Sequence, residues 1–402
     1  MDCHQGCARS GANKAAKQGR TKRDHTKRAE MINLGGRHSK IDLVAARRRL
    51  RVSGHLLLPL FFAGSAISMT APGWAEDWGM GAANRQIARG AVFSPTSTPA
   101  SQITTLAWFV LAITGVIFIT VAGLIAYSVI RFRARPSDQP REPAQLYGSN
   151  QIEFAWTAIP LLIVIVLILT TIRTIYDVQA AAEPLNAIHV RVIGHQWWWE
   201  FQYPDLGITT ANELHVPLSD SAHPAPTWLR LESADVAHSF WVPRLAGKTD
   251  LIPGRINTMW IDPHEPGTYL GQCAEFCGTE HALMMIRVVV EPRAAFDQWI
   301  AAQQLPAARQ GTAGHGAQVF ESNACVSCHA VKGTSAHGTY GPDLTHLMSR
   351  QTLGSGAAMN TPEYLKIWVR DPARIKPGVL MPAMNLSEHE LDDVVAWMVT
   401  LK

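Results

Sequence analysis

The segment from residue 273 to residue 284 brings together side chains that bind soft metal ions. It contains the thiols of Cys273 and Cys277, the imidazole of His281 and the thioether of Met284, and a second imidazole, His238, lies 35 residues before the first cysteine. Thiolate and thioether ligands stabilise Cu(I), whereas imidazole also accommodates Cu(II). A copper site with this ligand set can accept and release one electron with little rearrangement. The pattern therefore predicts a copper site with a redox function.

Two structural alternatives use the same cysteines. Cys273 and Cys277 could form a disulfide in an oxidising compartment, or they could join two histidines in a structural zinc site. Neither alternative gives a role to Met284. Zinc is bound by thiolate, imidazole and carboxylate rather than by thioether, and a disulfide needs no further ligands. We therefore favour copper.

A second redox motif lies nearer the C-terminus. Cys325-Val-Ser-Cys328-His329 has the C-x-x-C-H spacing of a c-type haem attachment site. In such a site both cysteines form thioether bonds to the haem and the histidine is an axial iron ligand. A thioredoxin-like motif is the alternative, but no βαβ pattern surrounds it. We expect a covalent haem c that also forms the core of a small helical domain.

The second axial ligand of this haem is expected to be a methionine, because Met/His ligation raises the reduction potential into the electron-transfer range. Candidates between the motif and the last helix are Met348, Met359, Met381 and Met384. Met381 lies in the loop of residues 376–382, which resembles the loop before the last helix of c-type cytochromes. Met381 is our choice, with Met384 as the alternative.

Two segments without charged residues, 101–130 and 154–172, are long enough to cross a membrane. About 20 apolar residues span about 30 Å of hydrocarbon, so we expect a hairpin of helices over about 103–130 and 154–176. Basic residues in the loop between them assign that loop to the cytoplasm, and everything after the second helix to the outer face of a bacterial inner membrane. The basic residues are Arg131, Arg133, Arg135 and Arg141.

Glu153 stands at the cytoplasmic start of the second predicted helix. A carboxylate in this position is either an ordinary interfacial charge or a proton donor to a pathway in a partner subunit. The sequence leaves both interpretations open.

The N-terminal region has the pattern of targeting sequence. Residues 1–46 are basic and without periodicity, which predicts a disordered tail. Residues 47–75 have the arginines, apolar run and small residues of a secretory signal peptide, with cleavage expected after Ala75 and an uncleaved anchor as the alternative. We assign no metal site to the potential ligands of the tail, which are Cys3, His4 and Cys7.

The composition is that of a membrane-anchored protein with several domains. Of the 402 residues 47% are hydrophobic and only 17% are charged. The net charge is +4, but basic residues crowd the first 51 positions and leave the remainder close to balanced, so nucleic-acid binding is not expected. Residues 76–182 hold an N-terminal segment and the hairpin. Short alternating strands over 183–292 predict an antiparallel β-sandwich or barrel. We expect a linker at 293–313 and an all-α domain at 314–402.

The pattern C-x-E-x-C-x-x-x-H-x-x-M resembles the CuA motif of cytochrome c oxidase subunit II, and the resemblance covers about residues 80–292. It implies a cupredoxin-like domain with a binuclear copper centre. Position by position, the resemblance implies two bridging thiolates, one histidine on each copper, a thioether on one and a backbone carbonyl on the other. The corresponding residues are Cys273 and Cys277, His238 and His281, Met284 and Glu275. In that family the matching Glu side chain also reaches a magnesium ion at the boundary with subunit I.

Residues 314–402 resemble a class I cytochrome c, so the resemblance implies electron transfer from haem c to CuA and on to a haem–copper catalytic subunit that reduces O₂ to water with proton translocation. Trp197, in Gly194-His195-Gln196-Trp197-Trp198-Trp199, matches the electron-entry position of the family. Residues 247–255 also resemble subunit II. The implied partners are oxidase subunits I and III, with cytochrome c or quinol–cytochrome c reductase as the donor.

Three other functions fit parts of the pattern. Nitrous oxide reductases have a similar copper motif, but typically with Trp at the position of Glu275, and they lack the hairpin. A CuA-containing nitric oxide reductase would need the same electron-entry subunit, since the partner determines which gas is reduced. A membrane-bound copper chaperone or sensor would not need the haem.

Overall fold

The computed structural model describes residues 91–134, 145, 147–179, 182–307 and 314–402. The predicted tail at 1–46, the predicted signal peptide at 47–75 and its cleavage point after Ala75 lie outside these residues.

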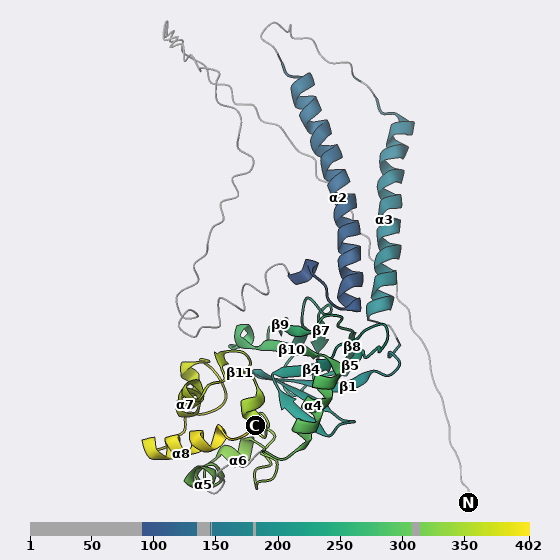
Figure 1. Cartoon of the computed structure of the whole chain (residues 1–402). Helices are drawn as coiled ribbons and strands as arrows, with labels where there is room; N and C mark the ends of the chain where they lie inside the picture. Colours follow the sequence, from purple (N-terminus) through teal and green to yellow (C-terminus); the bar gives the residue numbers. More distant parts are fainter. Residues whose placement is uncertain (1–90, 135–144, 146, 180–181, 308–313) are drawn as a thin grey trace, which may run out of the picture. The chain divides into compact units, whose positions relative to one another are not determined.

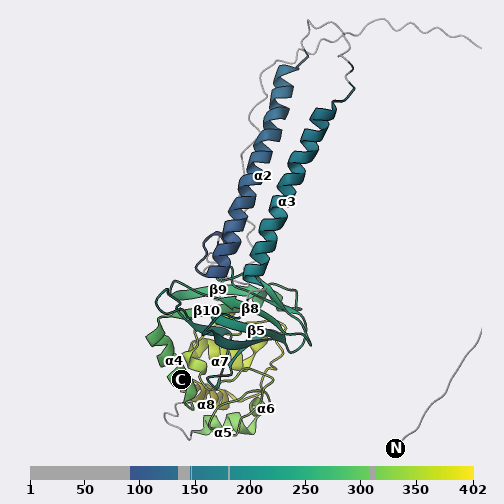
Figure 2. The same cartoon turned by 90° about the vertical axis from the view of Figure 1, so that its right-hand side faces the viewer.

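Two long helices form the hairpin, α2 (Thr98–Arg131) and α3 (Asn150–Val178), preceded by the short 3-10 helix η1 (Ala91–Phe93). Both are apolar around their whole circumference and long enough to span a membrane. They run side by side in both views (Figures 1 and 2). Their large apolar side chains are mostly exposed, as in Phe118 and Leu162. Lipid is the surrounding that would bury them.

The β domain consists of two five-stranded sheets (Figure 2), with strand orders β3-β2-β1-β5-β8 and β4-β10-β9-β6-β7. The strands are β1 (Ile188–His195), β2 (Trp198–Tyr203), β3 (Ile208–Ala211), β4 (Glu213–Pro217), β5 (Thr227–Ser233), β6 (His238–Trp241), β7 (Thr249–Leu251), β8 (Asn257–Ile261), β9 (Gly267–Cys273) and β10 (Met285–Glu291). The expected sandwich is therefore confirmed. Each sheet also contains one parallel pair, β1 with β5 and β4 with β10.

Alternating side chains form the core between the sheets. In β2 the residues Trp199, Phe201 and Tyr203 share one face and are almost completely buried, while their neighbours are half-buried. This period of two is what half-buried strands require. The hydroxyl of Tyr203 donates to His215 O at 2.7 Å and accepts from His215 N at 3.0 Å. The buried hydroxyl of Tyr203 therefore has one hydrogen-bond acceptor and one hydrogen-bond donor as partners.

Helix α4 (Arg293–Gln304) follows β10 and occupies the first part of the segment predicted as a linker. It packs on the β domain because its apolar face is aromatic. Phe296 is completely buried, and Trp299 stacks on His215 with ring centroids 4.5 Å apart.

The C-terminal domain is a small helical unit, as expected. Its helices are α5 (His315–Ser322), α6 (Cys325–Cys328), α7 (Pro362–Arg370) and α8 (Glu388–Met398), with 3-10 turns η3 (Leu347–Ser349) and η4 (Pro372–Arg374) and the short strands β11 (Thr352–Leu353) and β12 (Ala358–Met359). The predicted capping box of α8 is present, with Ser387 and Glu390 each bonding the other's backbone N–H. At Gly316 in α5 an added Cβ would lie 2.1 Å from Asp393 O, so only glycine permits this close approach of α5 to α8.

Replacing Tyr203 by Phe should destabilise the β domain. The change removes one hydroxyl and leaves the buried N–H and C=O of His215 without their partner, which costs about 1–3 kcal/mol. The exposed Tyr340, 68% accessible, is the control, and its replacement by Phe should change the unfolding free energy by less than about 0.5 kcal/mol. Urea unfolding followed by tryptophan fluorescence measures both, and equal losses in the two variants would contradict the assignment.

Candidate metal centres

Strand pairing brings His238 beside the first cysteine. β6 lies antiparallel to β9 with Phe240 opposite Cys273, and His238 Nδ1 is 3.9 Å from Cys273 Sγ. The sulfur atoms of Cys273 and Cys277 are 3.7 Å apart, and both cysteines are free. The other potential donors are Glu275 O at 3.2 Å from Cys273 Sγ, His281 Nδ1 at 3.6 Å from Cys277 Sγ and Met284 Sδ at 3.9 Å from Cys277 Sγ. All six sequence-predicted copper ligands therefore meet in one cluster.

Backbone hydrogen bonds close the segment that carries most of these atoms, residues 273–284, which we call the donor loop. Cys273 N donates to Met284 O at 2.9 Å, and Ala274 N donates to Ser239 O at 3.0 Å. The 3-10 turn η2 (His281–Leu283) then directs the end of the loop back to the first cysteine. His238 and Met284 are completely buried. The cluster is thus rigid and nearly dry.

Asp235 orients the imidazole of His238. Its Oδ1 lies 2.8 Å from His238 Nε2, which leaves Nδ1 directed at Cys273. The opposite side of the ring packs on Gly194 of β1, where an added Cβ would lie 2.8 Å from His238 Cδ2. A carboxylate on the outer nitrogen is the usual arrangement for a histidine that binds metal through the other nitrogen. We did not identify Asp235 from the sequence, where its only signal is an acidic residue three positions before His238.

The two thiols share a proton. The hydrogen bond between them lowers the pKa of Cys273 to about 3, against the effect of burial, and His238 adds to this lowering. The same hydrogen bond raises the pKa of Cys277. Since the thiolate is the form that binds metal, metal binding here would release a proton from the cysteine pair.

Trp197, the expected electron-entry residue, lies against the donor loop and is only 9% exposed. Its Nε1 donates to Cys277 O at 2.9 Å. Gly278, at φ +115°, makes room for it, because a Cβ there would lie 3.0 Å from the indole ring. Trp197 is therefore a buried neighbour of the cluster rather than an exposed side chain.

The Glu275 carboxylate points away from the sulfur atoms. Its Oε2 lies 3.7 Å from Lys248 Nζ, and both side chains are about half exposed. Only its backbone carbonyl belongs to the cluster. The predicted magnesium role would therefore use a half-exposed carboxylate that lies next to Lys248. The same lysine also pairs with Asp250.

The haem attachment motif is formed by α6 and the residue after it. Cys325 and Cys328 lie one helical turn apart, and His329 Nδ1 is 2.8 Å from Pro342 O. Nδ1–H then donates to this carbonyl and Nε2 is left for a metal. Gly341 approaches the ring so closely that a Cβ would lie 2.6 Å from His329 Cε1. Burial lowers the pKa of His329, which favours the neutral form that a ligand needs.

A buried arginine also fits a haem. Arg350 is 8% exposed, and its Nε has no hydrogen-bond partner among the described residues. Its charge contributes to the lowered pKa of His329. A guanidinium N–H without a partner near His329 is a donor that a haem propionate would satisfy.

The candidates for the second axial ligand lie in different surroundings. Met381 and Met384 are both half-buried in the segment between η4 and α8. Met348 packs against the core of the helical domain, and Met359 is 44% exposed in β12. The choice of Met381 over Met384 stays a prediction.

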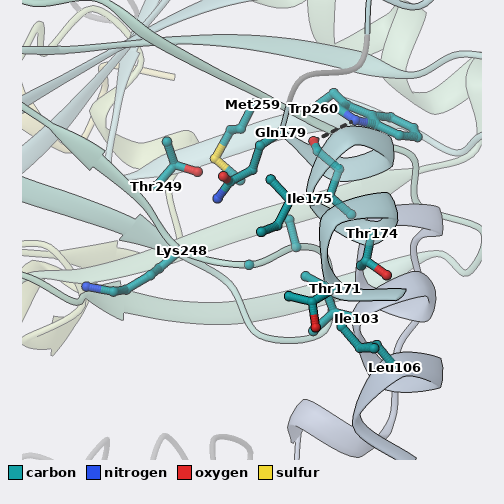
Figure 3. A pocket seen from close by; sticks show the side chains of 13 residues that line it. Ile103, Leu106, Thr171, Thr174, Ile175, Gln179, Lys248, Thr249, Met259 and Trp260 are labelled. Atoms are coloured by element: carbon teal, nitrogen blue, oxygen red, sulfur yellow. Dashed lines mark hydrogen bonds between the residues drawn. The ribbon is translucent and has the colours of Figure 1, made fainter. Parts of the chain in front are cut away.

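Glu153, the predicted proton-entry residue, is exposed in the first turn of α3, at the end of that helix far from the β domain. The opposite end of α3 adjoins a cavity of about 170 Å³ (Figure 3), lined among others by Ile175, Met259 and Trp260. Trp260 Nε1 donates to Val178 O at 3.2 Å, while Lys248 extends away from the helices. This junction joins the hairpin to the β domain and contains none of the metal donors.

Three family models match the chain. The model described as cytochrome c oxidase subunit II, transmembrane domain, matches residues 86–173, and the model of the periplasmic domain matches residues 222–291. The cytochrome c model matches residues 313–402. The expected fold classes are therefore confirmed: a two-helix hairpin, a cupredoxin-like β-sandwich and a cytochrome c domain.

Named relatives cover most of the chain. Cytochrome c oxidase subunit 2 of Alkalihalophilus pseudofirmus is 34% identical over 302 residues, which cover 72% of this chain and 86% of the relative. That of Bacillus subtilis is 30% identical over 297 residues, covering 69% and 82%. The solved periplasmic domain of subunit II of cytochrome oxidase from Bradyrhizobium japonicum is 29% identical, with a TM-score of 0.28, and covers 30% of this chain and 96% of that domain. With a relative of this identity along more than two thirds of its length, the chain belongs to the cytochrome c oxidase subunit 2 family.

Proposed function

We propose that the donor cluster holds a binuclear copper centre in which Cys273 and Cys277 bridge two copper ions. His238 and His281 each bind one copper, Met284 binds one, and Glu275 binds the other through its carbonyl oxygen. The observation that carries this proposal is that all six donor groups lie within 4 Å of a cysteine sulfur, with both thiols free. Soft sulfur and imidazole donors of this kind favour copper.

The chain's own residues give such a centre its rigidity. Asp235 holds the ring of His238, the bond from Cys273 N to Met284 O closes the loop, and the burial of Met284 excludes water. A donor set that is held in place before metal arrives needs little movement when the charge on the metal changes. Copper bound here supplies a one-electron redox centre.

Cys325 and Cys328 attach haem c covalently, His329 is one axial ligand, and Met381 is the other, with Met384 as the alternative. His329 is prepared for this by its bond to Pro342, which leaves Nε2 for iron. The haem supplies a second one-electron centre, and Arg350 donates to a propionate.

This chain is the electron-entry subunit of a haem–copper respiratory oxidase. Electrons pass from the haem c domain to the copper domain and on to the catalytic subunit. Helices α2 and α3 contain no histidine, so neither provides the ligands of an oxygen-reduction site. Reduction of O₂ to water therefore belongs to the partner subunit.

The external domains lie on the periplasmic side of the bacterial inner membrane, and the arginine-rich loop lies in the cytoplasm. Subunits I and III are the membrane partners, and cytochrome c or quinol–cytochrome c reductase is the electron donor. Glu153 serves proton entry from the cytoplasmic side. Glu275 shares a magnesium ion with subunit I, and Trp197 lies on the electron path into copper.

Metal and optical analysis of residues 180–402, matured in a periplasm and reconstituted with copper, tests this function. We expect two coppers and one haem per chain, a near-infrared mixed-valence copper band, a seven-line copper EPR pattern and a c-type pyridine haemochrome. The separate subunit should accept electrons and consume no oxygen. One zinc or one isolated copper per chain would exclude the binuclear centre. Oxygen uptake by the subunit alone would contradict the assignment of O₂ reduction to the partner subunit.

Replacing Asp235 by Ala should weaken copper binding by about 10- to 100-fold, the usual effect of losing the outer partner of a metal-binding histidine. Competition titration with a copper chelator measures the affinity. The matched control is Asp220→Ala, because Asp220 also accepts two backbone N–H groups but lies in an exposed turn away from the cluster. Equal affinities in the two variants would exclude an orienting role for Asp235.

Replacing Met381 by Ala should remove the sulfur–iron charge-transfer band and lower the haem potential, because the thioether ligand raises that potential. Met384→Ala should leave both unchanged. Redox titration and the visible spectrum of the oxidised protein distinguish the two residues, and the reverse result would assign the ligand to Met384.

A further inference from the structure

One segment of the haem domain, residues 351–355, bonds directly to strands β4 and β10 of the β domain. Ser355 is completely buried, its hydroxyl donates to Met285 O at 2.8 Å, and its carbonyl accepts from Met285 N at 3.0 Å. The carboxylate of Glu213, 1% exposed, accepts from Gln351 N at 2.8 Å and from Thr352 N at 3.1 Å. Two segments distant in the sequence thus meet in a dry, hydrogen-bonded contact.

Lys376 lies at the centre of this contact and is 1% exposed. Its Nζ donates to Trp197 O at 2.6 Å, to Leu283 O at 2.9 Å and to Gly354 O at 3.1 Å. The first two carbonyls belong to the β domain and the third to the haem domain. One ammonium therefore ties both domains together through all three of its N–H donors.

The carbonyls on the β-domain side belong to residues that adjoin the donor cluster. Leu283 directly precedes Met284 in the donor loop, and Trp197 donates through its ring to Cys277 O. Trp197 thus connects Lys376 to Cys277, because its carbonyl accepts from Lys376 Nζ and its ring nitrogen donates to Cys277 O.

Burying a lysine is costly, and its surroundings compensate only partly. Burial lowers the pKa of Lys376 to about 7, while the charge of Glu280 acts in the opposite direction. Glu280 itself is 3% exposed, and its Oε2 has no hydrogen-bond partner among the described residues. The segment after Lys376 also touches this residue, since a Cβ on Gly378 would lie 3.1 Å from Glu280 Oε1.

We propose that Lys376 is a positioning residue that holds the haem c domain in one fixed orientation on the donor loop, through hydrogen bonds to the carbonyls of Trp197 and Leu283. The inference rests on the proposed function of the two sites. Electron transfer from haem to copper then takes place within a preformed contact and does not wait for the tethered domain to find its partner. Three hydrogen bonds from one buried side chain, to carbonyls of both domains, give this contact its single geometry.

The test is Lys376→Met in the full-length chain within the oxidase complex, loaded with copper and haem. Methionine keeps most of the side-chain volume but leaves three buried carbonyls without a donor. Amide hydrogen exchange at residues 351–356 should become faster by about tenfold or more, as expected when a charged buried hydrogen-bond group is removed. Haem-to-copper electron transfer after flash reduction should slow by a similar factor and become dependent on solvent viscosity. The copper and haem spectra should stay as in the wild type.

Lys366→Met is the control, because Lys366 lies in the same domain and pairs with Asp392 and Glu388 of that domain alone. Its exchange and transfer rates should equal those of the wild type. A second variant, Ser355→Ala, keeps every charge and should change both rates in the same direction by a smaller factor.

The proposal is overturned if Lys376→Met keeps wild-type exchange and transfer rates with both centres loaded. It is also overturned if this variant loses the copper spectrum, because Lys376 would then support the donor loop rather than the docking of the haem domain. A wild-type chain without the mixed-valence copper band would instead reject the proposed function, and the exchange experiment would still report on the domain contact.

Discussion

Two buried cysteine sulfur atoms, 3.7 Å apart and not joined in a disulfide, form the constraint around which the β domain is organised. A disulfide would require the sulfurs at about 2.05 Å, so the backbone must keep them apart while bringing imidazole and thioether close. The pairing of β6 with β9 and the closure of the loop by Cys273 N and Met284 O do this. Because both devices are backbone hydrogen bonds, they do not depend on the charge of a metal.

The same loop also serves the second domain. Its side chains include sulfur and nitrogen donors, while the carbonyl of Leu283, and the backbone of Met285 directly after the loop, bond to the haem domain. Trp197 belongs to both surroundings, since its ring bonds to Cys277 and its carbonyl bonds to Lys376. The haem domain therefore bonds directly to residues that are neighbours of Met284 and Cys277 in the donor cluster.

The sequence indicated the side chains that the structure brings together in the donor cluster, and the metal-binding role of these side chains stays a prediction. Residues 273–284 and 325–329 could be found because their spacing within one loop or helical turn determines what they can bind. Asp235 and Lys376 could not be predicted from the sequence. Asp235 contacts the ring of His238 and Lys376 contacts backbone carbonyls, and neither kind of contact produces a recognisable sequence pattern. The parallel pairing of β1 with β5 was missed for a related reason: alternation indicates a strand but does not indicate its neighbour.

Helix α4 also could not be predicted from its own residues alone. Alanine and glutamine in residues 293–304 are compatible with either a linker or a helix, and Phe296 and Trp299 decide between them only when the β domain offers a surface to cover. Tertiary packing, rather than local propensity, selects the helix. Trp197 is a similar case, because a run of three tryptophans does not indicate which ring packs against the donor loop.

The buried contact at Lys376 limits how such a fusion can be reproduced by design. A cytochrome joined to another copper subunit by an arbitrary connection would gain local concentration but would lack the acceptors that orient it. The recipient would need free carbonyls at the positions of Trp197 and Leu283, a carboxylate at the position of Glu213, and a glycine where Gly278 now admits the indole ring. To move this cytochrome domain to another electron-transfer protein, the residues of the domain interface would have to be moved together with the domain.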